Sequence, residues 1–476
     1  MPEIFINGQA VQAEQGQTVL QAALANGFFI PYFCWHPNLS IAGNCRICVV
    51  QPEGKNWVEI ACNMPVADGV RVLTDSELVR EHRKMTLQFI LLNHPLDCGV
   101  CDKAGECSLQ DYHFAYNGES GGSVDPKVHA TKYYEPNSRI VLDNERCILC
   151  SRCVRFTREV SGSNGLGMLD RGDHSVVRAT DDGAFERDAY SDNVIDICPV
   201  GALLSKSFLH KARVWYLKAT PSVCPGCARG CTVDIWHRKP EWRVHNLDRR
   251  ENETIARVTP RENAEVNGPW ICNKGRDLAK IFERPRAELP LQKGKPVSVA
   301  TAIAAARTLI AGAKQPVALV STWASNEELA EFKRLLGSRF TTFVKRDCVA
   351  QPGEVVADDL LIRADKNPNT ATAEALFGTA PIAFPPGTDL VLVWGEGFNF
   401  AQLPRGVRVV YLSSFLAPEN GYADVFLPQS VQTERSGHYT NFEGVVSPFE
   451  RCFVKGRDVL DPLETFTALA SVGVPV

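Results

Sequence analysis

Cysteine is the residue that most constrains what this chain can fold into. Seventeen cysteines occur in its 476 residues, and fifteen of them lie in tight groups between Cys34 and Cys272. Only Cys348 and Cys452 lie beyond, each of them alone. A chain of this length has enough apolar residues to build cores without a disulfide framework, so metal binding is the better interpretation of the groups.

The first group comprises Cys34, Cys45, Cys48 and Cys62, spaced C-x10-C-x2-C-x13-C. The residues before it indicate a small β-rich unit, because Asn7-Gly8 is a strong hairpin turn and Thr18 to Asn26 has helical periodicity. A strand, turn, strand and helix followed by a cysteine-rich loop indicates a β-grasp ferredoxin domain. Four thiolates suit iron–sulfur chemistry, so we assign a [2Fe–2S] cluster here, with zinc as the alternative.

The second group consists of His94, Cys98, Cys101 and Cys107, spaced H-x3-C-x2-C-x5-C. Three neighbouring cysteines need a fourth ligand, and His94 is the nearest suitable donor. Because a set of three cysteines and one histidine suits zinc as well as iron, the spacing alone leaves both metals open. We expect residues 76–117, which contain this group, to be helical.

The third group has the most specific spacing in the chain. Its members are Cys147, Cys150, Cys153 and Cys198, the last followed by Pro199. The run C-x2-C-x2-C fits three corners of a [4Fe–4S] cube, and a remote Cys-Pro supplies the fourth corner, as in bacterial ferredoxins. Only one complete motif of this kind is present, so Cys198 most simply completes the same cluster.

The fourth group is Cys224, Cys227 and Cys231 with the distant Cys272. The run C-x2-C-x3-C and the remote cysteine again supply four thiolates, and zinc is again an alternative. We expect Trp270 and Ile271 to shield Cys272 from water.

The four groups use every cysteine up to Cys272. Fifteen cysteines and His94 make sixteen ligands, or four sets of four with none left over. Thiols held in clusters cannot serve as nucleophiles, so we predict no catalytic cysteine. We expect Cys348 and Cys452 to be ordinary buried thiols. A net charge of −4 gives no electrostatic reason to bind nucleic acid.

After Lys280 the pattern changes to alternating strands and helices. Three apolar runs have the length of buried strands, and two segments have helical periodicity. The alternation predicts an α/β domain with a mostly parallel sheet. The strands are expected at Val317–Ser321, Leu390–Trp394 and Val407–Leu412, and the helices at Val299–Ala311 and Glu327–Leu336.

No apolar run is long enough to span a bilayer, and the first residues do not have the pattern of a signal peptide. We therefore expect a cytoplasmic protein that reaches a membrane only by docking on partners.

The order of the groups resembles the large iron–sulfur subunit, of the G or 75 kDa type, of bacterial NADH:quinone oxidoreductase (respiratory complex I). The resemblance covers nearly the whole chain and its motifs are specific. It rests on His94-x3-Cys98, Cys198-Pro199-Val200-Gly201-Ala202-Leu203, Cys272-Asn273-Lys274-Gly275-Arg276, Leu361-Ile362-Arg363-Ala364-Asp365-Lys366 and Asn441-Phe442-Glu443-Gly444.

The resemblance implies an α+β multi-domain chain. Its parts would be a β-grasp [2Fe–2S] ferredoxin domain (1–78), a helical [4Fe–4S] segment with one histidine and three cysteine ligands (79–118), a [4Fe–4S] ferredoxin-like domain (138–215), a [4Fe–4S] domain of the molybdopterin-oxidoreductase N-terminal type (219–280) and a truncated α/β domain of the same type without the cofactor (281–476). It therefore implies one [2Fe–2S] and three [4Fe–4S] clusters, and no molybdopterin, because only about 200 residues follow Cys272.

By the same resemblance, the chain relays single electrons from a flavin-bearing NADH subunit toward quinone. Its expected place is the peripheral arm of a membrane complex, on the cytoplasmic side of the inner membrane and beside the quinone-side hydrophilic subunits. The chain is then part of an oxidoreductase without a complete active site of its own.

Two other interpretations stay open. Similar subunits serve soluble NAD-linked formate dehydrogenases, hydrogenases and CoA-ester reductases, which would keep the relay and change the partners. A scaffold stapled by zinc, with no redox role, is the interpretation from a different class of protein.

Overall fold

The structure of the chain is a computed structural model that describes residues 1–119, 121, 124–242 and 253–470. Contacts divide it into two compact units, Met1–Tyr216 and Leu217–Val476. Each unit contains both helices and strands, which confirms the prediction of an α+β chain with several domains.

The chain begins with the predicted hairpin and helix. Strands β1 (Glu3–Ile6) and β2 (Gln9–Gln12) are antiparallel, and both turn residues, Asn7 and Gly8, have positive φ as a tight hairpin requires. Helix α1 (Val19–Ala25) begins at a capping box made by Thr18 and Gln21. The sheet has the order β2-β1-β5-β3-β4, and β1 pairs in parallel with β5, so this is the expected β-grasp arrangement. The remaining strands are β3 (Val49–Pro52), β4 (Glu59–Ile60) and β5 (Arg71–Leu73).

The prediction of a helix over residues 76–117 is correct only in part. Helix α2 spans Glu77–Leu91, and the chain then leaves the helix for most of the next sixteen residues. Pro95 explains this break, because proline has no amide hydrogen and disfavours a helical conformation in the residue before it. The later elements are short: a 3-10 turn η2 (Cys98–Val100), helix α3 (Ser108–Tyr112) and a π-helical turn η3 (His113–Asn117).

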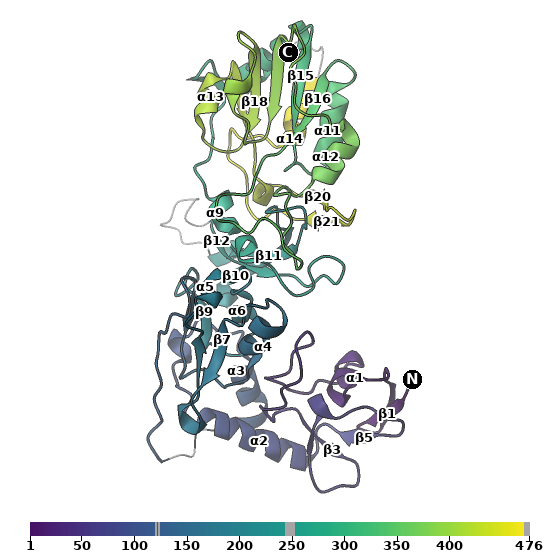
Figure 1. The fold of residues 1–476 in the computed structure, drawn as a ribbon, viewed down its shortest axis with the longest axis vertical. Coiled ribbons are helices and arrows are strands. Elements are labelled where there is room, and N and C mark those ends of the chain that lie inside the picture. The colour runs from purple at the N-terminus through teal and green to yellow at the C-terminus, as the bar shows by residue number, and fades with distance from the viewer. Residues whose placement is uncertain (120, 122–123, 243–252, 471–476) are drawn as a thin grey trace. The chain divides into compact units, whose positions relative to one another are not determined.

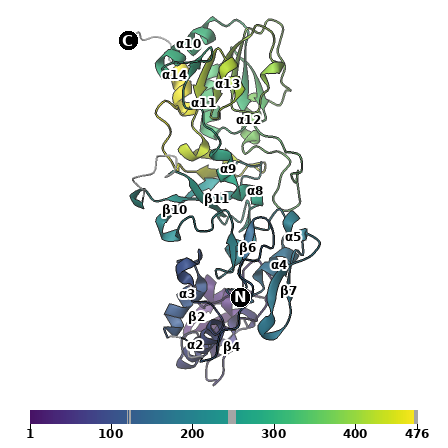
Figure 2. The ribbon, with the colours of Figure 1, turned by 90° about the vertical axis from the view of Figure 1, so that its left-hand side faces the viewer.

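The last part of the first unit is built from two small antiparallel sheets and short helices (Figure 2). Strand β6 (Ile140–Leu142) pairs with β9 (Leu203–Ser205), and β7 (Leu166–Leu169) pairs with β8 (Val176–Ala179). The other elements are α4 (Arg152–Glu159), η4 (Gly172–His174), α5 (Ala184–Arg187), α6 (Asn193–Ile197) and η5 (Val214–Tyr216).

The second unit opens with a three-stranded antiparallel sheet, β10-β11-β12. Its strands are β10 (Leu217–Val223), β11 (Thr232–Arg238) and β12 (Ile255–Pro260), and the 3-10 turn η6 (Pro240–Trp242) follows β11. Two short helices come next, α8 (Asn273–Arg276) and α9 (Leu278–Phe282).

The rest of the second unit is the predicted α/β domain. Its seven-stranded sheet has the order β14-β13-β19-β18-β17-β15-β16, and the five strands from β19 to β16 are parallel (Figure 1). The strands are β13 (Leu291–Gln292), β14 (Lys295–Pro296), β15 (Pro316–Ser321), β16 (Thr341–Lys345), β17 (Leu390–Trp394), β18 (Arg408–Ser413) and β19 (Val425–Pro428).

The two faces of this sheet are covered differently. Helices α10 (Val299–Gly312), α11 (Asn326–Leu336), α12 (Thr370–Phe377) and α14 (Pro462–Ala470) pack on one face (Figure 2). The other face packs against partly buried aromatic residues such as Phe384 and Phe398, which lie in irregular segments. The sheet is thus buried on both faces, by helices on one face and by irregular segments on the other. Its central strands are therefore apolar along their whole length.

The remaining elements of the α/β domain are small. They are η7 (Phe400–Gln402), α13 (Pro418–Tyr422), η8 (Gln432–Glu434), β20 (Gly437–Thr440) and β21 (Val446–Phe449). Among the described residues, no helix has both the length and the apolar composition needed to cross a membrane.

Candidate iron–sulfur sites

The structure brings the four cysteines of the first group together. Side-chain hydrogen bonds join Cys34 to Cys45 and to Cys62, and join Cys48 to Cys62. These contacts lower the pKa of the accepting thiols, Cys34 and Cys48, and raise the pKa of the donors, Cys45 and Cys62. The Cys34 amide also donates to the Cys45 sulfur over 3.4 Å. Four soft donors in contact, three of them buried, fit a cluster of iron and sulfide.

The second group is gathered less completely. Charge interactions link Cys101 to Cys98 and Cys107 to Cys101. The first turn after the break, η2, begins at Cys98, and the amide of Cys101 donates to the Cys98 carbonyl over 3.3 Å. Cys98 itself is exposed, whereas Cys101 is buried. The structure therefore places three thiols in one short, partly open loop.

His94 lies beside this loop with one ring nitrogen free. Its Nδ1 is buried and has no hydrogen-bond partner. Burial lowers the pKa of His94 to about 4, and Asp97 opposes this shift. The imidazole is consequently neutral at pH 7, which is the form that binds a metal. An unpaired buried nitrogen on a neutral ring fits the role of fourth ligand.

Gly201 supports the second group from a distance of 100 residues in sequence. A Cβ atom at Gly201 would lie 2.2 Å from the sulfur of Cys101 and 3.1 Å from Cβ of Lys103. Only glycine therefore fits at this position. Sequence reasoning placed Gly201 in the Cys-Pro motif of the third group and missed its contact with the second.

The third group surrounds a small cavity. Cys147, Cys150, Cys153 and Cys198 all line it, together with apolar side chains such as Leu142 and Val200. Burial raises the pKa of Cys147 to about 12 and that of Cys150 to about 11, and it also raises the pKa of Cys153. Such thiols keep their protons until a metal displaces them.

The loop that carries the third group has an unusual backbone. Leu149 and Ser151 both have positive φ, at 52° and 60°, in the left-handed region that residues with a Cβ seldom adopt. This conformation lets the Leu149 amide donate to the Cys147 sulfur over 3.4 Å. Strain of this kind is concentrated at functional sites.

The fourth group lies between the β10–β11 turn and the start of α8. Charge interactions link Cys224, Cys227, Cys231 and Cys272 to one another. Burial raises the pKa of Cys224 and Cys231 and raises that of Cys272 to about 11. Trp270 and Ile271 are buried, as we expected for residues that shield Cys272. Glycines at 226 and 275 bring backbone close to the Cys224 sulfur, with ideal Cβ positions at 3.4 and 3.5 Å.

Within the described part of the chain, no three His, Cys, Asp or Glu side chains are arranged to hold a single metal ion. A cluster has no such requirement, because its four protein ligands are distributed over two or four iron atoms.

The two remaining cysteines differ somewhat from expectation. Cys348 and Cys452 are partly exposed rather than fully buried. Cys348 lines a cavity of about 490 Å³ at the carboxyl ends of β15, β17 and β18, and it is the only cysteine among the described residues that line it. In this cavity the Asp347 carboxylate accepts the amide hydrogens of Thr322 (2.6 Å) and Glu396 (2.8 Å). The Asp347 carboxylate thus accepts hydrogen bonds from backbone amides that could otherwise bind a phosphate.

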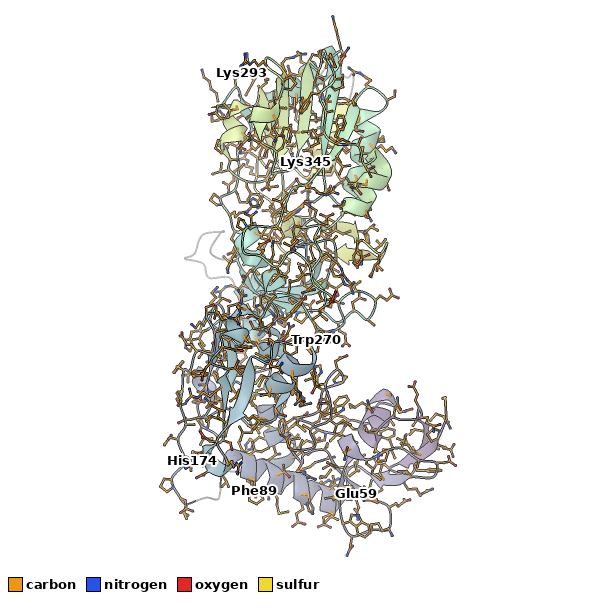
Figure 3. All side chains as sticks on the ribbon, in the orientation of Figure 1. Glu59, Phe89, His174, Trp270, Lys293 and Lys345 are labelled. Carbon is orange, nitrogen blue, oxygen red and sulfur yellow. The ribbon has the colours of Figure 1, made fainter. Side chains whose placement is uncertain are left out.

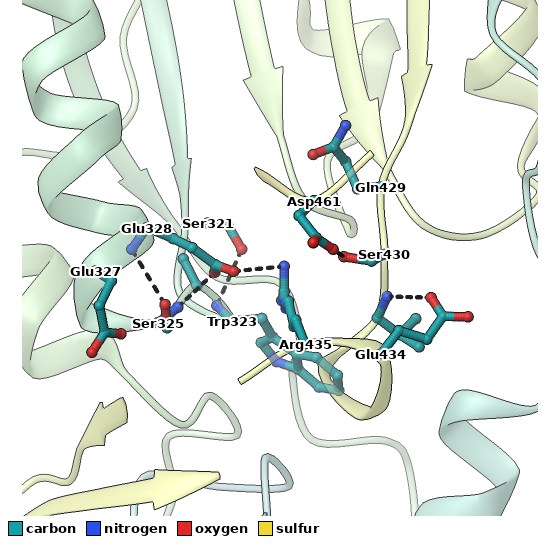
Figure 4. A network of polar contacts seen from close by, with 12 residues as sticks. Ser321, Trp323, Ser325, Glu327, Glu328, Gln429, Ser430, Glu434, Arg435 and Asp461 are labelled. Atoms are coloured by element: carbon teal, nitrogen blue, oxygen red, sulfur yellow. Dashed lines mark hydrogen bonds and ion pairs between the residues drawn. The ribbon is translucent and has the colours of Figure 1, made fainter. Parts of the chain in front are cut away.

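A buried polar network holds the loops around this cavity (Figure 4). Ser325 and Glu328 form a capping box at the start of α11. Glu328, a residue that is 2% exposed, pairs through its carboxylate with Arg435 over 3.1 Å. Ser430 donates to Asp461 over 2.5 Å on the neighbouring segment. The network fixes the C-terminal domain and supplies no ligand to the cysteine groups.

Comparisons with known proteins match four family models to successive parts of the chain. Residues 2–77 match a 2Fe-2S iron-sulfur cluster binding domain, and residues 83–120 match the NADH-ubiquinone oxidoreductase-G iron-sulfur binding region. Residues 137–204 match the ferredoxin-like domain of NADH-quinone oxidoreductase subunit 3, and residues 217–284 match the molybdopterin oxidoreductase Fe4S4 domain. The chain therefore has both 2Fe-2S and 4Fe-4S domains.

Related sequences carry names of the same kind. The mitochondrial NADH dehydrogenase [ubiquinone] iron-sulfur protein 1 of Solanum tuberosum is 40% identical over 293 residues, covering 61% of this chain and 38% of that protein. The NADH-ubiquinone oxidoreductase 75 kDa subunit of Reclinomonas americana is 39% identical, covering 62% and 40%. The G subunit of the NADH-quinone oxidoreductase of Rickettsia felis is 37% identical, covering 61% and 41%.

The chain thus spans about two fifths of the length of these relatives. Among solved structures, the crystal structure of NAD+-reducing [NiFe]-hydrogenase in the H2-reduced state aligns with a TM-score of 0.40 and 31% identity, covering 45% of this chain and 91% of that chain. The matches to curated proteins confirm the resemblance found in the sequence over about three fifths of the chain. Residues 2–284 of this chain are therefore built from four iron–sulfur domains, and the chain is related to the large iron–sulfur subunit, of the G or 75 kDa type, of NADH–quinone oxidoreductases.

Proposed function

We propose that this chain is an electron-transfer subunit of an NADH:quinone oxidoreductase and relays single electrons through four iron–sulfur clusters. The observation that carries the proposal is the collection of sixteen donors into four sets, each within a segment that matches an iron–sulfur domain family. The domain bounds that we propose are 1–78, 79–118, 138–215 and 219–280, followed by an α/β domain at 281–476.

We assign one [2Fe–2S] and three [4Fe–4S] clusters to these sets. The [2Fe–2S] cluster is held by Cys34, Cys45, Cys48 and Cys62. The [4Fe–4S] clusters are held by His94, Cys98, Cys101 and Cys107; by Cys147, Cys150, Cys153 and Cys198; and by Cys224, Cys227, Cys231 and Cys272. When bound, such clusters accept and release one electron at a time. No catalytic residue and no molybdopterin are proposed on this chain.

The protein's own contribution is to bury and separate these sets. Apolar walls such as Leu142 and Val200 around the third set exclude water, and they lower the local dielectric constant. Amides that donate to cysteine sulfur, as from Leu149 to Cys147, stabilise the thiolate form. These features set the reduction potential of each site and protect it from solvent.

Exposed apolar side chains around the second set support assembly with partner subunits. Phe89 on the outer side of α2 is 72% exposed (Figure 3), and Leu96 and Val100 are 86% and 57% exposed. A concentration of apolar side chains beside the exposed Cys98 is typical of a surface that another protein covers. The partners we propose are a flavin-bearing NADH-binding subunit and quinone-side hydrophilic subunits, on the cytoplasmic face of the inner membrane.

Purification of the native protein from detergent-solubilised membranes tests this function. We expect about fourteen irons per chain from the proposed clusters, together with electron paramagnetic resonance (EPR) signals of one [2Fe–2S] and of [4Fe–4S] centres. Co-migration with a flavoprotein that oxidises NADH and with integral membrane subunits supports the quinone assignment. A soluble particle that contains a formate, hydrogen or CoA-ester enzyme would keep the relay and overturn that assignment, and a colourless zinc protein would overturn both.

A further inference from the structure

A buried arginine connects the first and third ligand sets. Arg155 of α4 is 4% exposed, and its Nη2 donates to the carbonyl of Cys34 over 2.5 Å and to the carbonyl of Cys150 over 3.3 Å. Its Nη1 donates to the carbonyl of Ser40, in the loop between Cys34 and Cys45. One guanidinium thus bonds the backbone of one ligand from each set, Cys34 and Cys150, which lie more than 100 residues apart in sequence.

A second arginine repeats this pattern beside the first. Arg152, one turn earlier on α4, is 8% exposed. It donates to the carbonyl of Trp35 over 2.6 Å and to the carbonyl of Ile197 over 3.0 Å. Trp35 follows Cys34, and Ile197 precedes Cys198, so this guanidinium also joins the first set to the third.

Two further contacts close the same interface. The Glu159 carboxylate accepts from the amide of Ser40 over 2.8 Å and from its hydroxyl over 2.7 Å. The Asn44 side chain donates to the carbonyl of Leu149 over 3.1 Å. The loop of the first set is therefore fixed to the third set by side chains at both ends of α4 and by the Cys147–Cys150 turn.

The charges at this interface are unusual. Apart from the Ser151 hydroxyl, the acceptors described for the two guanidiniums are carbonyl oxygens, and the charge of Arg155 acts on Cys34, Cys150 and Glu159. Burying two positive charges is costly unless negative charge lies nearby. Two sets of thiolates, one on each side, supply that charge when their clusters are bound.

We propose that Arg155, assisted by Arg152, is a positioning residue that couples the first and third iron–sulfur sites. Its fork holds the two ligand loops at a fixed separation, and its positive charge stabilises the extra electron at either site. With clusters bound at both sets, an electron passing between them would oxidise one by a single electron and reduce the other, and the arginine would keep all its protons. This inference rests on the proposed function, because it needs clusters at both sets.

Three variants test the proposal in the purified complex, with EPR-monitored redox titration as the measurement. Arg155→Gln removes the charge and most of the fork. Arg155→Lys keeps the positive charge but loses the planar guanidinium. If the charge sets the potentials, this variant restores them toward the wild-type values, whereas structural damage would leave them shifted. Arg158→Gln is the control on the same helix: the Arg158 side chain is 59% exposed and pairs with Glu159, so this variant removes a positive charge at the edge of the interface while both buried guanidiniums stay in place.

We expect Arg155→Gln to lower the midpoint potentials of the first and third clusters together. The expected shift corresponds to at least a tenfold change in each one-electron reduction equilibrium, about 59 mV. The second and fourth clusters stay at their wild-type potentials, Arg155→Lys recovers most of the shift, and Arg158→Gln moves none of the four.

The outcomes separate the inference from the function on which it rests. If Arg155→Gln binds both clusters and neither potential moves, or only one moves, the coupling role is refuted. If that variant does not retain its clusters, Arg152→Gln is the second test, since it leaves Arg155 in place. The same two potentials must then fall together, and the inference fails if they do not. Absence of a [2Fe–2S] signal from the wild-type chain instead refutes the cluster assignment itself.

Discussion

Replacing Gly201 with alanine tests the geometry of the second site most directly. The new Cβ would lie 2.2 Å from the Cys101 sulfur, whereas non-bonded heavy atoms settle at about 3.5–4.0 Å. Either the sulfur or the Cys198–Gly201 backbone must therefore move by about 1.3 Å or more. Metal sites tolerate displacements of only about 0.5 Å, so the second cluster cannot keep its ligand set. Overpacking of this kind also costs about 1–3 kcal/mol of folding free energy.

The assay is iron content per chain together with the EPR spectrum of the reduced protein and its denaturation midpoint. We expect Gly201→Ala to lose the signal of the second cluster and to retain those of the first and fourth. Gly167→Ala is the control, because a Cβ there meets no heavy atom within 4 Å. A Gly201→Ala protein with full iron content, four unchanged signals and wild-type stability would refute the reasoning.

Three further predictions address ligand type, pH and the C-terminal domain. His94→Cys replaces a neutral ligand with an anionic one and should lower the potential of the second cluster; a redox titration that finds it unchanged or higher contradicts this. Burial, together with Arg152 and Arg155, lowers the pKa of His36 to about 4 from its ordinary 6.5. Between these pH values His36 is protonated in the unfolded chain and neutral in the folded chain, so the free energy of unfolding decreases as the pH falls. The variant His36→Gln lacks this titrating group and should show a weaker dependence of the urea midpoint on pH. Equal slopes for both proteins would refute this. Glu328→Gln leaves the partly buried guanidinium of Arg435 without its carboxylate partner and should cost about 3–5 kcal/mol in chemical denaturation while iron content stays constant; a cost below about 1 kcal/mol would count against it.

Local patterns predicted much of the fold. The hairpin at Asn7-Gly8 and the helix after Thr18 appear where the sequence places them, because turn and capping preferences act over a few residues. The buried strands β15 and β17 also match, since a strand that is apolar on both faces must lie inside a parallel sheet. The helix predicted over residues 76–117 is wrong after Leu91, because the apolar residues before Pro95 suggested a continuation that proline forbids.

The apolar stretch of α2 shows a second limit of periodicity. Leu87 is fully buried, yet Phe89 is 72% exposed on the same helix. Hydrophobicity tells which residues prefer to leave water, but not whether they pack within this chain or against another protein. The faces of the C-terminal sheet behave similarly, since one is covered by helices and the other by irregular segments.

The sequence by itself predicts the composition of the ligand sets, because most of the donors fall in short loops, where spacing is a local property, and the donors come in groups of four. Tertiary structure alone decided which sets become neighbours. Gly201 of the third group packs against Cys101 of the second, and Arg155 reaches Cys34 across 121 positions of sequence. Such contacts depend on how separately folded segments pack against one another. Bringing together residues so far apart in sequence costs conformational entropy, and burial of the whole interface, rather than any one residue, offsets this cost.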